Sequence, residues 1–203
     1  MISTILFDLD GVLVDACDWH YRSLNCALVK FGYSAINKEE HLLKYNGLPT
    51  HIKLEMLGVD ERQAKQINKA KQEFTLEIIR KTAEIMPEKI ELHKYLKQNG
   101  ILIGCVTNSI RKTAEEMLSR TGQLEFMDIL ITNEDVPRNK PSPDCYNEAV
   151  NKLKTLPENC LCVEDSPKGI LAAKLSVVPH LWIVDNTTNV TQDACLSQIE
   201  RIL

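Results

Sequence analysis

Two aspartates near the N-terminus, Asp8 and Asp10, have the side chains best placed for chemistry. They follow the apolar run 5–7 and precede Gly11, which permits a sharp turn. Residues two positions apart at the end of a strand point to the same side, so both carboxylates can face one ligand and bind a hard cation together. An Asp-x-Asp pair alone is weak evidence, because it also occurs in nucleotide-sugar transferases and in plain acidic loops.

Three later segments place further polar groups directly after apolar runs or in stiffened loops. In Thr107-Asn108-Ser109, the threonine hydroxyl and the N–H groups of a following helix can hold a phosphate, although Ser109 also fits an ordinary N-cap. Lys140 stands in a proline-rich loop and can pair with phosphate and carboxylates, the alternative being a solvated surface lysine. Glu164-Asp165 adds carboxylates whose mutual repulsion a cation or several hydrogen-bond donors must offset.

Five short apolar runs precede or surround these positions and predict buried parallel strands at 5–7, 101–106, 129–131, 161–163 and 181–184. Between the runs lie segments of helical period. Strand and helix therefore alternate, which predicts an α/β fold with a doubly wound, Rossmann-like parallel sheet.

Three of the predicted helices have recognisable starts or inward faces. Ser142 as N-cap and Pro143 in the first turn open the first, whose inward residues are Tyr146, Ala149, Val150 and Leu153. The second follows Ser109 and ends at Gly122, with Ala114, Met117 and Leu118 inward. The third follows Ser166-Pro167, with Ile170 and Ala173 inward.

The stretch 16–85 contains no convincing strand but several helical periods, such as Ala64, Ile67, Lys71, Phe74 and Ile78. We predict an all-helical insert over 16–85 in an α/β core made of 1–15 and 86–203. An insert directly after the first strand can stand over the carboxyl ends of the strands, where open α/β sheets bind ligands. The insert would therefore act as a lid.

In order and spacing, four segments resemble the motifs of the haloacid dehalogenase-like superfamily. They are Asp8-Leu9-Asp10-Gly11-Val12, Thr107-Asn108, Lys140-Pro141 and Glu164-Asp165-Ser166-Pro167-Lys168-Gly169. The helical insert resembles the subgroup with a small helical cap, which includes phosphoglycolate phosphatase-like and β-phosphoglucomutase-like enzymes. The chain departs from the pattern at 174–179, where the family usually has Gly-Met. The resemblance therefore does not predict the conformation of the turn from the last helix into the last strand.

The resemblance implies phosphoryl transfer through an aspartyl-phosphate. Asp8 would be the nucleophile, and Asp10 would protonate the leaving oxygen and then take a proton from water, with a pKa kept high by the neighbouring carboxylate. Thr107, the Asn108 backbone and Lys140 would hold the transferring oxygens. Mg²⁺ would be bound by the Asp8 carboxylate, the Asp10 carbonyl, Asp165 and water, with Glu164 as a further ligand or outside the first ligand shell.

Substrate specificity is expected in the insert, at His20 and in the loop 47–53, which includes Thr50 and Lys53. His20 resembles the histidine that assists proton transfer in mutase relatives, and it equally fits a packing residue. Lys53 and Lys71 can meet a substrate anion or can simply be solvated. Mutase relatives tend to place an arginine about where Thr50 stands, so its absence favours a phosphatase.

The leading hypothesis is a Mg²⁺-dependent phosphatase of a small soluble phosphomonoester, and a β-phosphoglucomutase-like sugar-phosphate mutase is the alternative. A phospho-accepting receiver module shares the aspartate, threonine and lysine, but it is shorter and lacks the insert. A degenerate member that works through protein contacts is disfavoured by the joint presence of Asp8, Asp10, Thr107, Lys140 and Asp165.

Composition excludes other classes of partner. With 24 basic and 28 acidic residues among 203, the net charge of −4 gives no broad field for nucleic acid or an anionic membrane. No apolar run is long enough to span a bilayer, and no signal peptide is expected, which together predict a cytoplasmic protein. The seven scattered cysteines predict reduced thiols, with Cys160 and Cys162 filling one face of a strand. No obligate protein partner is evident.

Overall fold

The computed structural model describes residues 1–45 and 48–202, and the chain divides into two compact units. One unit combines Met1–Asp15 with the chain from Glu84 onward, and the other is Ala16–Ala83. The first contains all five strands, and the second is built from helices alone in its described residues.

The α/β unit is organised around five parallel strands in the order β3-β2-β1-β4-β5. The strands are β1 (Thr4–Phe7), β2 (Leu102–Val106), β3 (Ile129–Ile131), β4 (Cys160–Glu164) and β5 (His180–Ile183). Phe7 pairs with Cys105 on one side and with Val163 on the other. The residues that follow these three strands therefore lie side by side at one edge of the sheet. The predicted doubly wound parallel sheet is confirmed.

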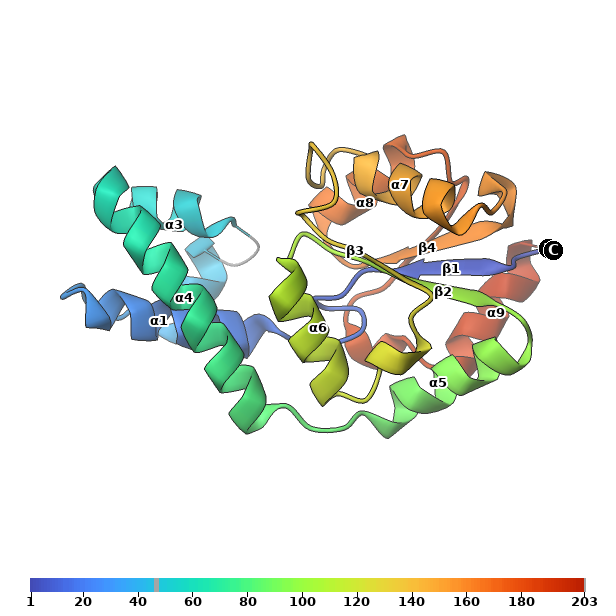
Figure 1. The fold of residues 1–203 in the computed structure, drawn as a ribbon, viewed down its shortest axis with the longest axis horizontal. Coiled ribbons are helices and arrows are strands. Elements are labelled where there is room, and N and C mark those ends of the chain that lie inside the picture. Colours follow the sequence, from blue (N-terminus) through green and yellow to red (C-terminus); the bar gives the residue numbers. More distant parts are fainter. Residues whose placement is uncertain (46–47, 203) are drawn as a thin grey trace. The chain divides into compact units, whose positions relative to one another are not determined.

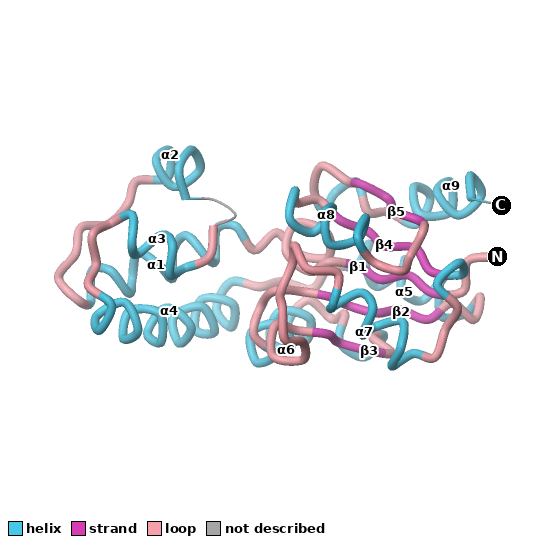
Figure 2. The backbone as a smooth tube through the Cα atoms, turned by 90° about the horizontal axis from the view of Figure 1, so that it is seen from above, coloured by secondary structure: helices cyan, strands magenta, loops and turns pink. Residues whose placement is uncertain are grey.

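Helices cover both faces of this sheet (Figures 1 and 2). One face carries α7 (Asp144–Leu153) and α8 (Pro167–Leu175), and the other carries α5 (Pro87–Gln98), α6 (Arg111–Arg120) and α9 (Gln192–Ile202). Short 3₁₀ turns complete the unit at Leu124–Phe126, Pro157–Asn159 and Thr187–Asn189.

Alternation along the strands explains the two cores. Leu6, Cys160 and Cys162 belong to one cluster of buried side chains with residues of α7 and α8, so the prediction that the two cysteines share a face is confirmed. On the opposite face, Phe7 meets His93 of α5 edge to face, with ring centroids 5.9 Å apart.

Most helix faces agree with the sequence pattern, but one helix start is corrected. The buried set of α7 includes Tyr146, Ala149 and Val150, as predicted. Ser142 does not cap this helix, because the helix begins at Asp144 and Pro143 occupies the N-cap position; the Ser142 hydroxyl instead donates to the Asp144 carboxylate at 2.8 Å. In α8, Ala173 is buried as predicted, whereas Ile170 is only half-buried.

The atypical segment 174–179 comprises the last two residues of α8 and a compact turn that leads into β5. The hydroxyl of Ser176 donates to the carbonyl of Ala173 at 2.7 Å and accepts the N–H of Val178 at 3.1 Å. Asn147 accepts the N–H of Val177 at 2.9 Å. Side chains thus provide hydrogen-bond partners for one backbone carbonyl and two backbone N–H groups of this turn. The turn leads into β5, which pairs with β4 in parallel.

The helical unit packs α1 (Cys17–Lys30) against α4 (Glu61–Thr82). Two short helices, α2 (Lys38–Glu40) and α3 (Thr50–Met56), and a π-helical turn at His41–Tyr45 complete it. Its core consists of Leu24, Ala27, Leu28, Ile36, Tyr45, Leu54, Val59, Ile67 and Ala70. None of the helices in the described ranges of either unit is long and apolar enough to cross a membrane.

Candidate active site

Lys140 occupies the centre of the polar cluster at the carboxyl edge of the sheet. It is buried, and its Nζ lies 2.6 Å from Asp8 Oδ1, 2.6 Å from Glu164 Oε1 and 2.7 Å from the carbonyl oxygen of Val106. Burial lowers the pKa of Lys140, but the Asp8 and Glu164 carboxylates outweigh it and raise the pKa above the ordinary value. The lysine is therefore an ammonium ion that ties the ends of β1 and β4 together, and it is not a solvated surface residue.

Asp8 extends β1 by one residue, because its N–H donates to the carbonyl of Val163 at 2.9 Å. Burial raises the pKa of Asp8; the Lys140 ammonium lowers it, and the carboxylates of Glu164 and Asp10 raise it, so that the net shift is upward. The aspartate is thus held in a low-dielectric position by one cation among several acids. An additional positive charge would favour its ionised form.

Tyr146 is an unpredicted member of this cluster. Its hydroxyl donates to Glu164 Oε1 at 2.7 Å, and the Lys140 ammonium lies 5.0 Å from its ring centroid. Burial and then Glu164 raise the pKa of Tyr146 well above the usual value, so the hydroxyl remains a donor. Gly169 packs against the same carboxylate, and a Cβ there would lie 2.0 Å from both Glu164 oxygens. Tyr146 and Gly169 therefore determine where Glu164 lies.

The carboxylates of Asp8, Glu164 and Asp165 each place an oxygen within 4.8 Å of the others. Glu164 Oε2 and Asp165 Oδ1 are buried and have no hydrogen-bond partner among the described residues. Burial, followed by Glu164, raises the pKa of Asp165 to about 6. Unpartnered acidic oxygens at this spacing fit a hard divalent cation, which would supply the missing positive charge. The three acids can hold a metal ion.

Gly11 makes room for this acidic group. Its φ of +90° confirms the predicted sharp turn, and a Cβ at this position would lie 2.0 Å from Asp165 Oδ2. The Gly11 N–H closes the turn, because it donates to the Val14 carbonyl at 2.7 Å. The side-chain amide of Gln123, which follows α6, holds the turn from outside by donating to the Leu13 carbonyl at 3.2 Å.

Residues 107–109, which follow β2, make contacts with Lys140 and Asp10 that the sequence did not predict. Thr107 is buried and its hydroxyl accepts the N–H of Ser109 at 3.0 Å. The Asn108 side chain makes two hydrogen bonds with the backbone of Lys140: its oxygen accepts the N–H at 2.9 Å, and its nitrogen donates to the carbonyl at 3.1 Å. Ser109 is not the N-cap of α6, which begins at Arg111; its hydroxyl donates to Asp10 Oδ2 at 3.1 Å. Asn108 positions the lysine loop, and Ser109 orients Asp10.

The candidates for substrate contact belong to the helical unit. His20 lies half-buried on α1, Thr50 is the first residue of α3, and Lys53 is buried on α3. The prediction of a loop over 47–53 is wrong from Thr50 onward, because these residues form α3, and Gly47 lies outside the described residues.

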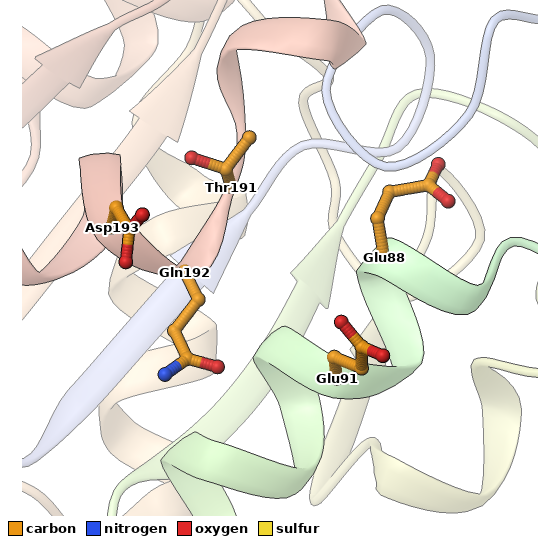
Figure 3. A pocket seen from close by; sticks show the side chains of 5 residues that line it. All are labelled: Glu88, Glu91, Thr191, Gln192 and Asp193. Atoms are coloured by element: carbon orange, nitrogen blue, oxygen red, sulfur yellow. The ribbon is translucent and has the colours of Figure 1, made fainter.

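A separate hollow of about 280 Å³ lies between α5 and the start of α9 (Figure 3). It is lined by Glu88, Glu91, Thr191, Gln192 and Asp193. Three of these side chains are exposed carboxylates, which repel a phosphate. This hollow contains none of the predicted site residues.

Comparison with known proteins agrees with the geometry. The family model described as haloacid dehalogenase-like hydrolase matches residues 5–183, which include β2 to β5, all of β1 except its first residue, and the whole acidic cluster. The chain belongs to the haloacid dehalogenase-like hydrolases. Among sequence relatives, it is 30% identical to validoxylamine A 7'-phosphate phosphatase of Streptomyces hygroscopicus over 182 residues, 86% of this chain and 82% of that protein.

A second relative in this family is pyrophosphatase PpaX of Oceanobacillus iheyensis, 29% identical over 189 residues, which cover 92% of this chain and 86% of that protein. Among solved structures, β-phosphoglucomutase of Clostridium difficile superimposes with a TM-score of 0.80 over 99% of this chain and 98% of that chain, at 23% identity. At that identity the likeness shows the fold alone. The predicted family and fold are confirmed.

Three partners of the haloacid dehalogenase-like site were missed by sequence reasoning: Tyr146, Gly169 and the side chain of Ser109. Tyr146 fitted the helical period of α7 and therefore looked like a core residue. Gly169 was part of the quoted motif but had no assigned role, although a glycine in the first turn of a helix is a signal of close packing.

Proposed function

We propose that this haloacid dehalogenase-like hydrolase is a Mg²⁺-dependent phosphatase that hydrolyses a small soluble phosphomonoester. The observation that carries the proposal is the position of Lys140, whose ammonium group lies 2.6 Å from both Asp8 and Glu164. The relatives named as phosphatases support the same reaction class. The chemistry follows from what each group can do at this edge of the sheet.

Asp8 is the proposed nucleophile. Its carboxylate oxygen attacks phosphorus, the bond from phosphorus to the leaving oxygen breaks, and an aspartyl-phosphate forms. Lys140 holds Asp8 Oδ1 at 2.6 Å, so one oxygen is anchored and the carboxylate cannot rotate out of line. The ammonium also offsets negative charge on the transferring oxygens.

Asp10 is the proposed general acid and base. It gives a proton to the leaving oxygen in the first step and takes one from the attacking water in the second, which releases inorganic phosphate and restores Asp8. The Ser109 hydroxyl, 3.1 Å from Asp10 Oδ2, supports this role because it fixes the orientation of the carboxylate. Thr107, with the N–H groups after it, and Lys140 would bind the phosphoryl oxygens.

Asp8, the backbone carbonyl of Asp10 and Asp165 are the proposed ligands of Mg²⁺, which when bound would neutralise phosphoryl charge. The unpartnered Asp165 Oδ1 supports this assignment. Glu164 offers its second oxygen, Oε2, to the ion or to a water molecule on it, because Oε1 is already bound by Lys140 and Tyr146.

The helical unit is the proposed lid, with His20, Thr50 and Lys53 as its substrate-contacting candidates. The partner is then a small phosphorylated metabolite, with no nucleic acid or obligate protein partner. A cytoplasmic location is part of the proposal and is supported by the odd number and scattered positions of the cysteines.

The test is a phosphate-release screen over sugar, glycolate, nucleotide and amino-acid phosphates, with and without Mg²⁺. At least one ester should release phosphate only when the metal is present, and Asp8→Asn should abolish the release because an amide is a poor nucleophile. Asp193→Asn, which makes the same change in the hollow of Figure 3, is the matched control and should retain full activity.

The alternative, a sugar-phosphate mutase, predicts a different result in the same assay. Interconversion of glucose 1-phosphate and glucose 6-phosphate without phosphate release from any ester would refute the phosphatase. Release of phosphate from one ester, with no such interconversion, would refute the mutase.

A further inference from the structure

Gln123, in the connection between α6 and β3, is fully buried, and its side-chain amide has hydrogen-bond partners at both ends. Its Nε2 donates to the Leu13 carbonyl at 3.2 Å and to the Thr121 hydroxyl at 2.9 Å. A carbonyl oxygen only accepts, so Nε2 must face Leu13, and Oε1 then accepts a hydrogen bond from Nε2 of His93 at 2.9 Å. The amide therefore has one orientation, and it joins His93 of α5 to the loop that follows β1.

His93 anchors the acceptor end of this amide. Its ring is fully buried, with its centroid 5.9 Å from that of Phe7 and 5.8 Å from that of Phe126. A proton on Nδ1 would be an unpaired buried donor, because Nδ1 has no hydrogen-bond partner among the described residues; the neutral ring thus carries its proton on Nε2, toward Gln123. Phe7 is the last residue of β1 and directly precedes Asp8. The amide is therefore fixed against the strand from which Asp8 extends.

The backbone around Gln123 is also held, by the segment through which the chain re-enters the α/β unit. The Met86 N–H donates to the Thr121 carbonyl at 3.1 Å, and Met86 Sδ lies 3.8 Å from Gln123 Nε2. Gly122 packs closely against α5, since a Cβ on it would lie 2.9 Å from the Ile90 side chain. Gln123 is thus fixed at its backbone and at its amide, so it cannot follow a displaced loop.

The loop that accepts this hydrogen bond is closed by bonds of its own. The N–H groups of Leu13 and Val14 both donate to the Leu9 carbonyl at 3.0 Å, and Asp10 and Val14 form an isolated parallel bridge. Leu9 and Leu13 are fully buried, so solvent does not replace a donor lost at the Leu13 carbonyl. Because Asp10 lies inside this closed turn, a displacement of Leu13 also displaces Asp10.

We propose that Gln123 is a positioning residue for the hydrolytic reaction, because its amide fixes the Leu13 carbonyl and thereby the loop that carries Asp10. The proposal rests on the proposed function, in which Asp10 moves protons in both chemical steps. A general acid must stay within hydrogen-bond reach of the leaving oxygen, and a misplacement of about 1 Å can cost about 100-fold in rate. The effect of losing the amide therefore falls on kcat more than on KM.

Two substitutions of Gln123 and one matched control test this role in the full chain. Gln123→Met keeps the length of the side chain and removes the amide, and Gln123→Asn keeps an amide that is too short by one methylene group to reach both Leu13 and His93. Thr4→Val is the control, because it removes a buried hydrogen bond, 2.9 Å long, between two hydroxyls at the other end of β1. Urea unfolding shows how much each change destabilises the fold.

Native-state hydrogen exchange, followed by NMR without denaturant, reads the loop directly and needs no substrate. We expect the amides of Leu13 and Val14 to exchange about tenfold or more faster in both Gln123 variants than in the parent, and less than about threefold faster in Thr4→Val. Unchanged exchange in the Gln123 variants, or the same acceleration in all three proteins, would overturn the proposal.

Steady-state phosphate release reads the consequence for the reaction, at a temperature where all four proteins are folded. Both Gln123 variants should lower kcat about tenfold or more while KM changes less than about threefold, and Thr4→Val should keep kcat within about twofold of the parent. Parental kcat in the Gln123 variants, or an equal fall in Thr4→Val, refutes the positioning role. If the parent hydrolyses no ester, the proposed function fails, and the exchange rates still decide whether Gln123 fixes the loop.

Discussion

Replacing Tyr146 with phenylalanine removes a single hydrogen bond from the centre of the active site. The hydroxyl donates to Glu164 Oε1 at 2.7 Å, and both side chains are completely buried. Phenylalanine keeps the ring, and therefore its packing on α7 and its contact with the Lys140 ammonium at 5.0 Å. The substitution consequently tests the hydrogen bond and little else.

The cost follows from the charge and burial of the acceptor. A hydrogen bond to a charged group contributes about 1.5–3 kcal/mol, and loss of the donor leaves the Glu164 carboxylate with Lys140 alone. We expect the free energy of unfolding to fall by about 2 kcal/mol. Since Glu164 and Asp8 share the same ammonium, a displaced Glu164 also shifts Lys140 relative to Asp8, and kcat should fall about tenfold or more while KM changes less.

Urea unfolding and steady-state phosphate release measure the two effects on the same preparation. Tyr95→Phe is the control, because Tyr95 lies on α5 of the same unit and its hydroxyl has no hydrogen bond among the described residues; its unfolding free energy should change by less than about 0.5 kcal/mol. A Tyr146→Phe protein as stable and as active as the parent would refute the argument that this hydroxyl positions Glu164.

Three further changes have defined outcomes. Lys140→Met leaves two buried carboxylates without their ammonium, so activity should fall at least about 100-fold and urea unfolding should show a loss of about 3–5 kcal/mol; more than a tenth of parental activity would contradict this. Gly11→Ala should raise the Mg²⁺ concentration needed for half-maximal activity, since its Cβ would lie 2.0 Å from Asp165 Oδ2, whereas Gly58→Ala, with φ +70° and open space, should not. His93 is buried, and burial is the main reason why its pKa is lowered to about 4. Between pH 6.5 and 4, the histidine therefore gains a proton in the unfolded chain but not in the folded chain. Unfolding free energies should consequently decrease by up to about 3 kcal/mol as the pH falls from 6.5 to 4, and His93→Gln should remove this component; the same pH dependence in the variant would contradict it.

The positions of Asp8, Thr107, Lys140 and Glu164-Asp165 near one edge were predictable because each except the lysine directly follows an apolar run. Parallel strands in register place their carboxyl ends together, and the register of β1 with β2 and β4 does so here. The lysine could be placed only through the family resemblance, since nothing in the loop itself distinguishes a buried lysine from a solvated one.

The partners of these residues could not be read from local patterns. Tyr146 and Glu164 are 18 positions apart, and Ser109 and Asp10 are 99 apart, so their hydrogen bonds depend on how the elements pack. Local rules instead favoured the nearest use of each side chain: a core residue for Tyr146 and an N-cap for Ser109. Ser142 was not the N-cap because α7 begins one residue later than the sequence pattern suggested, at Asp144, and the Ser142 hydroxyl donates to the Asp144 carboxylate.

The same limit applies to the helical unit. Lys53 was a candidate on sequence grounds, but His41 was not, because a histidine in a polar helical stretch has no distinguishing neighbour in the chain. Its burial and its edge contact with the Tyr21 ring arise only when α1 and the π-helical turn pack together.

Covalent trapping tests the central claim most directly. The protein is mixed with a hydrolysed ester and Mg²⁺, quenched in acid within milliseconds, digested and examined by mass spectrometry. A phosphoryl group on Asp8, absent from Asp8→Asn and more abundant when Asp10→Asn slows the attack of water, is the predicted result. Rapid phosphate release with no phosphorylated Asp8 at any quench time would contradict it.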